Sequence, residues 1–212
     1  SNNQNKELEY HKKNKVKVSS LMIILFFSFG IFNAALSTSQ NNVKLLVQYS
    51  LLDIYDTEIT SNIFSYIIAA SRITRLVSAI VFGRIYRIIN KSFLIIPSTL
   101  FVAVILAIVG FYIDVPLIKF GLMAISYCLI LAVRDPMRLY TEHTAFKISD
   151  KKQMELAYTY VQLFRKSFVA LSSFLVSALI LKFELIYIIY FAGFICLIEL
   201  VVAYRLYKLL GN

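Results

Sequence analysis

The sequence predicts an all-α, polytopic membrane protein with six transmembrane helices and both termini in the cytoplasm, and three observations lead to this prediction. First, 59% of the 212 residues are hydrophobic and 16% are charged, whereas soluble domains are about half apolar and a quarter charged. Second, the chain contains six apolar stretches of about the 20 residues that a helix needs to cross a bilayer. Third, Lys and Arg are concentrated in alternate connections between these stretches. The apolar excess excludes a disordered chain, and the presence of only two cysteines excludes a disulfide-framed secreted module.

The six stretches are predicted to be helices, because they lack the alternation of a membrane barrel and backbone groups in lipid must be satisfied within the segment. The fourth stretch is predicted to close at Asp135-Pro136, since the residue before a proline disfavours the helical region. The predicted spans cover about residues 21–39, 59–82, 93–113, 117–133, 161–181 and 185–207.

The distribution of basic residues predicts the orientation. With the amino end inside, fifteen of the 22 Lys and Arg residues lie in cytoplasmic segments and three, Lys44, Lys119 and Lys182, lie in outer ones. By the positive-inside rule, both termini are then cytoplasmic. The same distribution explains the net charge of +10 without a nucleic-acid partner, because a nucleic-acid binder would gather its basic residues on a soluble domain.

Two regions follow from this topology. Residues 1–20 are predicted to be a polar, basic cytoplasmic linker, and residues 21–212 to be a six-helix transmembrane bundle. The lipid bilayer is therefore expected to be one partner of the chain. We expect an integral membrane protein of a bacterial cell membrane. In a second interpretation, residues 12–40 are a secretory signal, whose cleavage would leave five spans.

The first apolar unit is interrupted by six polar residues, 37–42, after which apolar character resumes over residues 43–54. One interpretation is a long helix broken at this point, as in transporters whose substrate meets exposed backbone. The other is a span followed by a short helix at the outer membrane surface.

Two arginines, Arg72 and Arg75, fall inside the second span. A charge at the centre of a bilayer costs about 2.5–3.5 kcal/mol on insertion scales, so each needs an explanation. At helical spacing they share a stripe with Ser61 and Ser65, which predicts a face turned towards a neighbouring helix or a wet cavity. They form either an anion or carboxylate site or a charged gate, or else their side chains reach the inner headgroups.

Glu199 is the only acidic residue well inside a span. The fifth and sixth spans form a hairpin near Lys182, and counting away from the turn places Arg165 or Lys166 at the depth of Glu199. If the two helices touch, this spacing predicts a structural ion pair. A proton-coupling role for Glu199 is the alternative.

The sequence shows no pattern of a cofactor, metal or catalytic site. It contains no GxxxxGK[ST] loop, no HExxH pair and no paired carboxylates. His143 is predicted to lie in a solvated loop, and Cys128 and Cys196 to be packing residues. We therefore expect no enzyme activity, no cofactor and no metal.

The segment Gly83-Arg84-Ile85-Tyr86-Arg87-Ile88-Ile89-Asn90-Lys91 resembles the signature loop of the major facilitator superfamily. Gly83 matches the opening glycine, Ile85 the aliphatic position and Lys91 a closing base. Arg87 stands where the family has an acid, and neither Ile88 nor Asn90 matches the pattern. Residues 134–166 also resemble the cytoplasmic join between the tenth and eleventh helices of bacterial members. The resemblance covers nearly the whole chain and identifies it with the carboxy-terminal six-helix half of such a transporter.

This resemblance implies two six-helix bundles with a small-molecule substrate between them. The amino-terminal half, or a second copy of the chain, is then the required partner. The first span (Asn33, Gln40, Asn41) and the fourth (Ser126, Tyr127) would face the cavity, with the second and fifth beside it and the third and sixth facing lipid. The loop with Gly83, Arg84, Arg87 and Lys91 would act as a gate.

The predicted function is secondary active transport, driven by an ion or substrate gradient because no nucleotide-binding loop is present. The alternatives are the transmembrane half of an ATP-binding-cassette exporter and a non-transporting integral membrane component. The exporter is disfavoured because the connections at 83–92 and 134–153 are predicted to be short, whereas such halves carry long cytoplasmic helical extensions.

Overall fold

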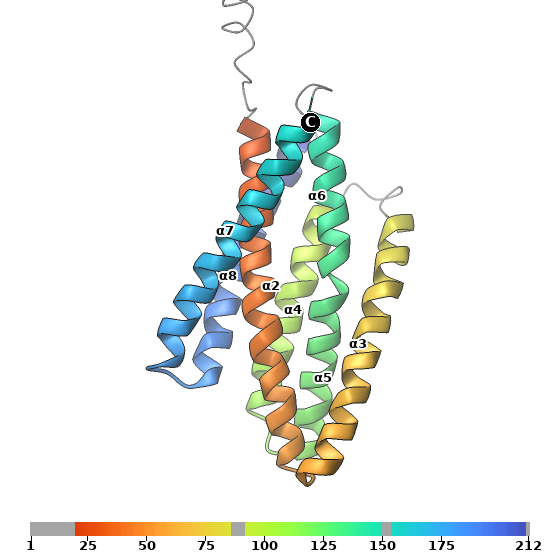
Figure 1. The fold of residues 1–212 in the computed structure, drawn as a ribbon, viewed down its shortest axis with the longest axis vertical. Helices are drawn as coiled ribbons and strands as arrows, with labels where there is room; N and C mark the ends of the chain where they lie inside the picture. Colours follow the sequence, from red (N-terminus) through yellow and green to blue (C-terminus); the bar gives the residue numbers. More distant parts are fainter. Residues whose placement is uncertain (1–19, 86–91, 150–153, 211–212) are drawn as a thin grey trace, which may run out of the picture.

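The computed structural model describes residues 20–85, 92–149 and 154–210, and within these residues the chain is helical, with no strand. The helices are α2 (Ser20–Leu52), α3 (Thr57–Ile85), α4 (Ser92–Phe111), α5 (Pro116–Ala132), α6 (Arg134–Ile148), α7 (Met154–Ile180) and α8 (Leu185–Leu210). Because α5 and α6 follow one another almost directly, they make one crossing of the bundle (Figure 1). Six crossings in the described residues are long and apolar enough to span a membrane, which confirms the predicted fold class.

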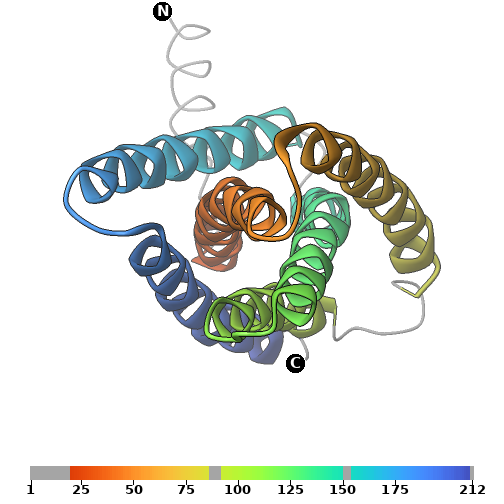
Figure 2. The same cartoon turned by 90° about the horizontal axis from the view of Figure 1, so that it is seen from below.

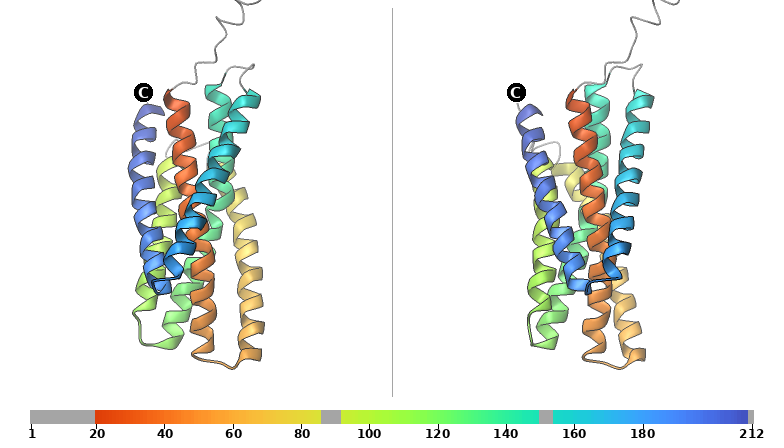
Figure 3. Two further views of the ribbon diagram at one scale, coloured as in Figure 1. Left: turned by 60° about the vertical axis from the view of Figure 1, so that its left-hand side comes forward. Right: turned by 90° about the vertical axis from the view of Figure 1, so that its left-hand side faces the viewer.

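Helix α2 occupies the centre of the bundle, and the other helices surround it (Figure 2). It is correspondingly the most buried crossing, with 67% of its most apolar window inside the protein. The start of α2 and the end of α8 lie at the same end of the bundle (Figure 3). This agrees with an even number of crossings, whereas the assignment of that end to the cytoplasm stays a prediction.

Aromatic side chains and one glycine hold α2 against α7. The ring of Phe26 lies 6.1 Å from that of Tyr160 and 6.0 Å from that of Phe164, measured between centroids. One turn further along α2, a Cβ atom added to Gly30 would lie 2.7 Å from the ring of Phe168. Since no real Cβ contact is that short, Gly30 permits the two helices to approach this closely.

The polar segment 37–42 does not interrupt α2, so both predicted alternatives for this segment are wrong. Two buried side chains of this segment hydrogen-bond within the helix: Ser39 Oγ donates to the carbonyl of Ala35 at 2.7 Å, and Asn42 Nδ2 donates to that of Thr38 at 2.6 Å. The buried Thr38 hydroxyl has no hydrogen-bond partner among the described residues. Ser39 and Asn42 are buried between neighbouring helices. Burial costs little for a polar group that is hydrogen-bonded, and the helix therefore continues to Leu52.

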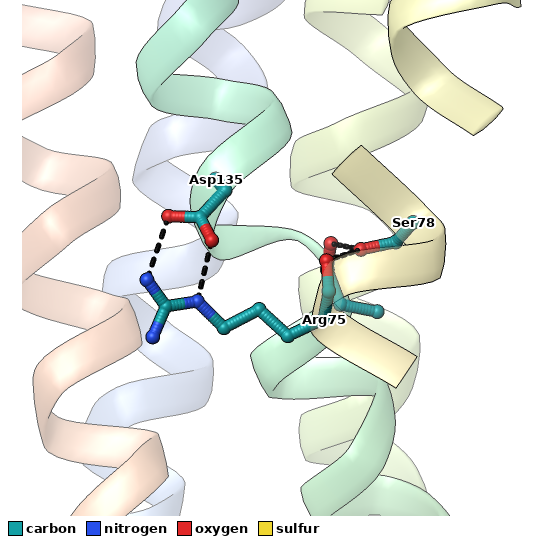
Figure 4. Close-up of polar contacts among 4 residues, drawn as sticks. Arg75, Ser78 and Asp135 are labelled. Atoms are coloured by element: carbon teal, nitrogen blue, oxygen red, sulfur yellow. Dashed lines mark hydrogen bonds and ion pairs between the residues drawn. The ribbon is translucent and has the colours of Figure 1, made fainter. Parts of the chain in front are cut away.

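The predicted connection at residues 134–153 is also different, because residues 134–148 form α6. Pro136 falls in its first turn, where a missing N–H breaks no bond inside α6. It does, however, leave the carbonyl of Ala132 without its donor four residues on. Ser78 of α3 donates to this oxygen at 2.7 Å (Figure 4), with its hydroxyl also 2.8 Å from the carbonyl of Arg75.

Candidate functional site

A cavity of about 350 Å³ opens between helices α2, α3, α6 and α7. These helices belong to the first, second, fourth and fifth crossings, and the third (α4) and sixth (α8) contribute no lining residue. The lining consists of Asn33, Leu36, Ser37, Gln40, Arg75, Arg134, Asp135, Arg138, Arg165, Lys166, Val169 and Ala170.

Three of the polar lining residues lie several turns away from the nearer ends of their helices. At 1.5 Å per residue, Asn33 lies roughly 20 Å from the start of α2, Arg75 roughly 15 Å from the end of α3 and Arg165 roughly 17 Å from the start of α7. The starts of α2 and α7 lie at one end of the bundle, and α3 ends short of that level (Figure 1). The cavity therefore lies well inside the bundle rather than at its rim.

Arg75 holds a carboxylate of the chain itself. Its Nε atom donates to Asp135 Oδ2 at 2.5 Å and its Nη2 atom to Oδ1 at 3.0 Å, so that both carboxylate oxygens are bound (Figure 4). The Asp135 side chain is 16% exposed. Together with the bond from Ser78 to Ala132, this pair fixes α3 against the junction of α5 and α6.

The remaining basic side chains of the cavity have little acidic compensation. Arg138 Nε lies 4.0 Å from Glu142 Oε1, at the limit of an ion pair. Arg134, Arg165 and Lys166 form no salt bridge with any acid in the part of the chain that the structure describes. Arg134, Arg138 and Lys166 are exposed and Arg165 is half-buried, so water or an anion can reach all four charges. Such contact is needed wherever they lie within the bilayer, because an uncompensated charge there costs up to about 2.5–3.5 kcal/mol.

Like charges in the cavity also act on one another. Arg134 lies within electrostatic range of Arg75, Arg138 and Arg165, which repel it, and Asp135 only partly offsets them. The four arginines come from three helices, so the packing of the bundle, rather than any local segment, brings them together. Such a concentration of positive charge attracts anions into the cavity.

A neutral polar stripe on α2 completes the lining. Asn33, Ser37 and Gln40 are four and three residues apart and so share one face of the helix. All three are half-buried, and Asn33 Nδ2 donates to the carbonyl of Phe29 at 2.7 Å. These side chains offer amide and hydroxyl groups to an occupant of the cavity.

Other residues expected at the site lie elsewhere. Asn41 and Arg72 are exposed and do not line the cavity. Ser126 is buried and donates to the carbonyl of Ala103 on α4 at 2.6 Å, and Tyr127 is buried in the core. The fourth crossing instead reaches the cavity through α6.

The expected gating loop is described only in part. Gly83 and Arg84 belong to the last turn of α3, where Arg84 is exposed. Arg87 and Lys91 lie outside the described residues.

The ion pair expected between Glu199 and Arg165 or Lys166 does not form. Glu199 is buried, and its Oε1 atom accepts a hydrogen bond from Ser28 Oγ at 2.6 Å, whereas Oε2 has no hydrogen-bond partner. The helices α7 and α8 diverge from their hairpin, and α2 packs against both (Figure 2). The basic residues consequently line the cavity, and Glu199 meets α2 instead.

Sequence reasoning missed Arg134, Asp135 and Arg138, because it treated residues 134–153 as a connection. A signal was available in the sequence: Met137, Tyr140 and Ala145 recur at helical spacing and the segment has no glycine. The structure buries these three residues together with Pro136, Thr141 and Thr144.

The described residues contain no group of three His, Cys, Asp or Glu side chains that could hold a metal ion. Cys128 and Cys196 are free thiols, and His143 lies exposed on α6 rather than in a loop. No family model, curated protein or solved structure matches the chain.

Proposed function

We propose that this protein is a secondary active transporter of the bacterial cell membrane, built as the carboxy-terminal half of a major-facilitator-type protein, and that the cavity binds its small-molecule substrate. The observation that carries this proposal is the identity of the lining helices. The cavity takes its residues from the first, second, fourth and fifth crossings alone, which are the crossings that the resemblance assigns to the substrate side.

The high exposure of α3 and α7 supports a partner that packs against these two helices. Only 6% of the most apolar window of α3 and of α7 is buried, whereas the values for the other crossings range from 39% to 67%. Both helices flank the central α2 (Figure 2) and both line the cavity. An amino-terminal six-helix half, or a second copy of the chain, would cover them and close the cavity.

A flux assay tests the proposal. The full-length protein is reconstituted in vesicles and supplied with anionic, neutral and cationic small solutes, with and without a proton or sodium gradient. We expect gradient-dependent accumulation of at least one solute, with strong loss in Arg165→Gln, which removes a cavity charge. The matched control is Arg205→Gln, which removes an exposed arginine of α8 outside the cavity.

Either of two results contradicts the proposal. One is a folded full-length protein that moves none of the solutes under any gradient. The other is a flux that Arg165→Gln leaves at the level of Arg205→Gln, since the substrate path would then avoid the cavity.

A further inference from the structure

We infer that the cavity recognises an oxyanion, a carboxylate or phosphate group carried by the transported solute. This inference rests on the proposed function, because it names the substrate class of the same cavity. It starts from the balance of charge: five basic residues line the cavity and one acidic residue does.

The single acid cannot neutralise the group. Both oxygens of Asp135 are engaged by Arg75, so this pair balances itself. Arg134, Arg165 and Lys166 then face the cavity without an acidic partner among the described residues, and Arg138 has only its distant contact with Glu142. Arg134, Arg138 and Lys166 are exposed at the cavity and Arg165 is half-buried. A neutral or cationic occupant would leave their charges to solvent alone, whereas an anion would compensate them.

The residue types favour an oxyanion over a simple halide. A guanidinium group presents paired N–H donors whose spacing matches two oxygens of one carboxylate or phosphate. Arg75 already binds a carboxylate in this way inside the same cavity (Figure 4). Arg134 of α6 and Arg165 of α7 offer the same chemistry from two different helices, and Lys166 adds a mobile point charge.

The size and the neutral side of the cavity limit the ligand further. At about 350 Å³ it lies near the lower end of small-molecule sites, which run from roughly 300 to 1,000 Å³. Ser37 and Gln40 on α2 can hydrogen-bond an uncharged polar part of the ligand. A small solute with one or two oxyanion groups fits both features.

The binding test uses the full-length protein in nanodiscs of phosphatidylcholine alone. Sodium phosphate and sodium succinate are titrated at constant ionic strength against sodium chloride, and binding is followed by calorimetry and thermal unfolding. We expect saturable binding of phosphate or succinate that chloride does not reproduce. Arg134→Gln and Arg165→Gln should each weaken it by at least about tenfold, as the loss of a charge-assisted bond predicts.

Two controls separate a lost contact from a damaged fold. Arg165→Lys keeps the charge and should bind more tightly than Arg165→Gln. Arg205→Gln removes a charge outside the cavity and should bind like the unmodified protein.

A second arm of the experiment adds phosphatidylglycerol to the nanodiscs. Stabilisation that is seen only with this lipid, and that is lost in Arg165→Gln, would identify a lipid headgroup as the source of the oxyanion. That result would overturn the assignment of the oxyanion to a solute.

Other results overturn the inference outright. These are no response to phosphate, succinate or phosphatidylglycerol, or the same response in Arg165→Gln as in the unmodified protein. The binding test and the flux test can fail independently, so the two proposals can be distinguished. Anion binding without gradient-driven flux contradicts the proposed function, whereas flux of a neutral or cationic solute that neither phosphate nor succinate inhibits supports the transporter and overturns the oxyanion site.

Discussion

Ser78 on α3 donates a hydrogen bond to the carbonyl oxygen of Ala132, the last residue of α5. In an uninterrupted helix this oxygen would accept from the amide four residues on, but residue 136 is a proline and has no N–H. A side chain from a neighbouring helix thus repairs a defect that the proline creates. The bond also sets the position of α3 beside Asp135, one residue past the start of α6.

Replacing Ser78 with Ala should lower the free energy of unfolding by about 1–3 kcal/mol, because it leaves a buried carbonyl unsatisfied. The measurement is thermal or chemical unfolding in detergent. In a Pro136→Ala background, the new amide can donate to Ala132 and the penalty should shrink. An equal penalty in both backgrounds would show that Ser78 does not compensate for the proline.

Breaking the bidentate pair should also destabilise the bundle. Arg75→Gln and Asp135→Asn should each cost about 1–3 kcal/mol, and the double variant should cost less than the sum, because each single change leaves the other group unpaired. Arg72→Gln is the matched control on the same helix, since Arg72 is exposed. We expect it to stay within about 0.5 kcal/mol of the unmodified protein. Additive costs for the two partners would contradict the pairing.

The close approach of α2 and α7 predicts different outcomes for two glycines. Gly30→Ala should destabilise the protein by about 1–3 kcal/mol, because the new methyl group would overlap the ring of Phe168. Phe168→Leu in the same chain should recover part of this loss. Gly121→Ala should be tolerated, because no atom lies within 4 Å of its added Cβ. The comparison is made by unfolding in detergent, and a neutral Gly30→Ala would show that the helices do not meet there.

The contact between Ser28 and Glu199 predicts how the buried acid responds to substitution. Glu199→Gln keeps an oxygen that can accept from Ser28 and should preserve folding, whereas Glu199→Ala should cost about 1–3 kcal/mol. Because Arg165 lies in the cavity, Arg165→Gln and Glu199→Gln should have additive effects on unfolding. Strong coupling between these two changes would show that Arg165 and Glu199 interact, as the sequence predicted.

The predicted orientation places Lys182 on the outer side of the membrane and Lys208 on the cytoplasmic side, and cysteine labelling at these two positions tests it. In a cysteine-free background, a cysteine placed at Lys182 should react with a thiol reagent added outside intact cells, and one placed at Lys208 should react only after the membrane is opened. Lys182 lies in the turn that precedes α8 and Lys208 in the last turn of α8, so the two positions lie at opposite ends of the last crossing. External labelling of the second position would invert the predicted orientation.

Most of the fold could be predicted because lipid imposes a simple requirement on the sequence. A helix must be apolar over its crossing, so all six crossings of the described residues appear as hydrophobic stretches. The errors arose where a run of polar residues was interpreted as the end of a helix. Residues 37–42 stay helical because Ser39 and Asn42 bond to their own helix, and α6 stays helical because its proline lies in the first turn.

The candidate site could be predicted only in part, since hydropathy identifies charged residues in a span but not their neighbours. Arg75 and Arg165 were expected to matter, but their environments were not foreseen. The carboxylate held by Arg75 lies 60 residues away in the sequence, at the start of a helix that sequence reasoning treated as a connection.

By itself, the sequence determined the number of crossings and the apolar part of each, and it predicted the side on which basic residues gather, because these depend on composition along a single segment. The tertiary structure alone decided that α2 lies between α7 and α8, that Asp135 meets Arg75 and that Glu199 meets Ser28. The reason is that helix packing depends on the shapes and small residues of several segments at once, such as Gly30 against Phe168.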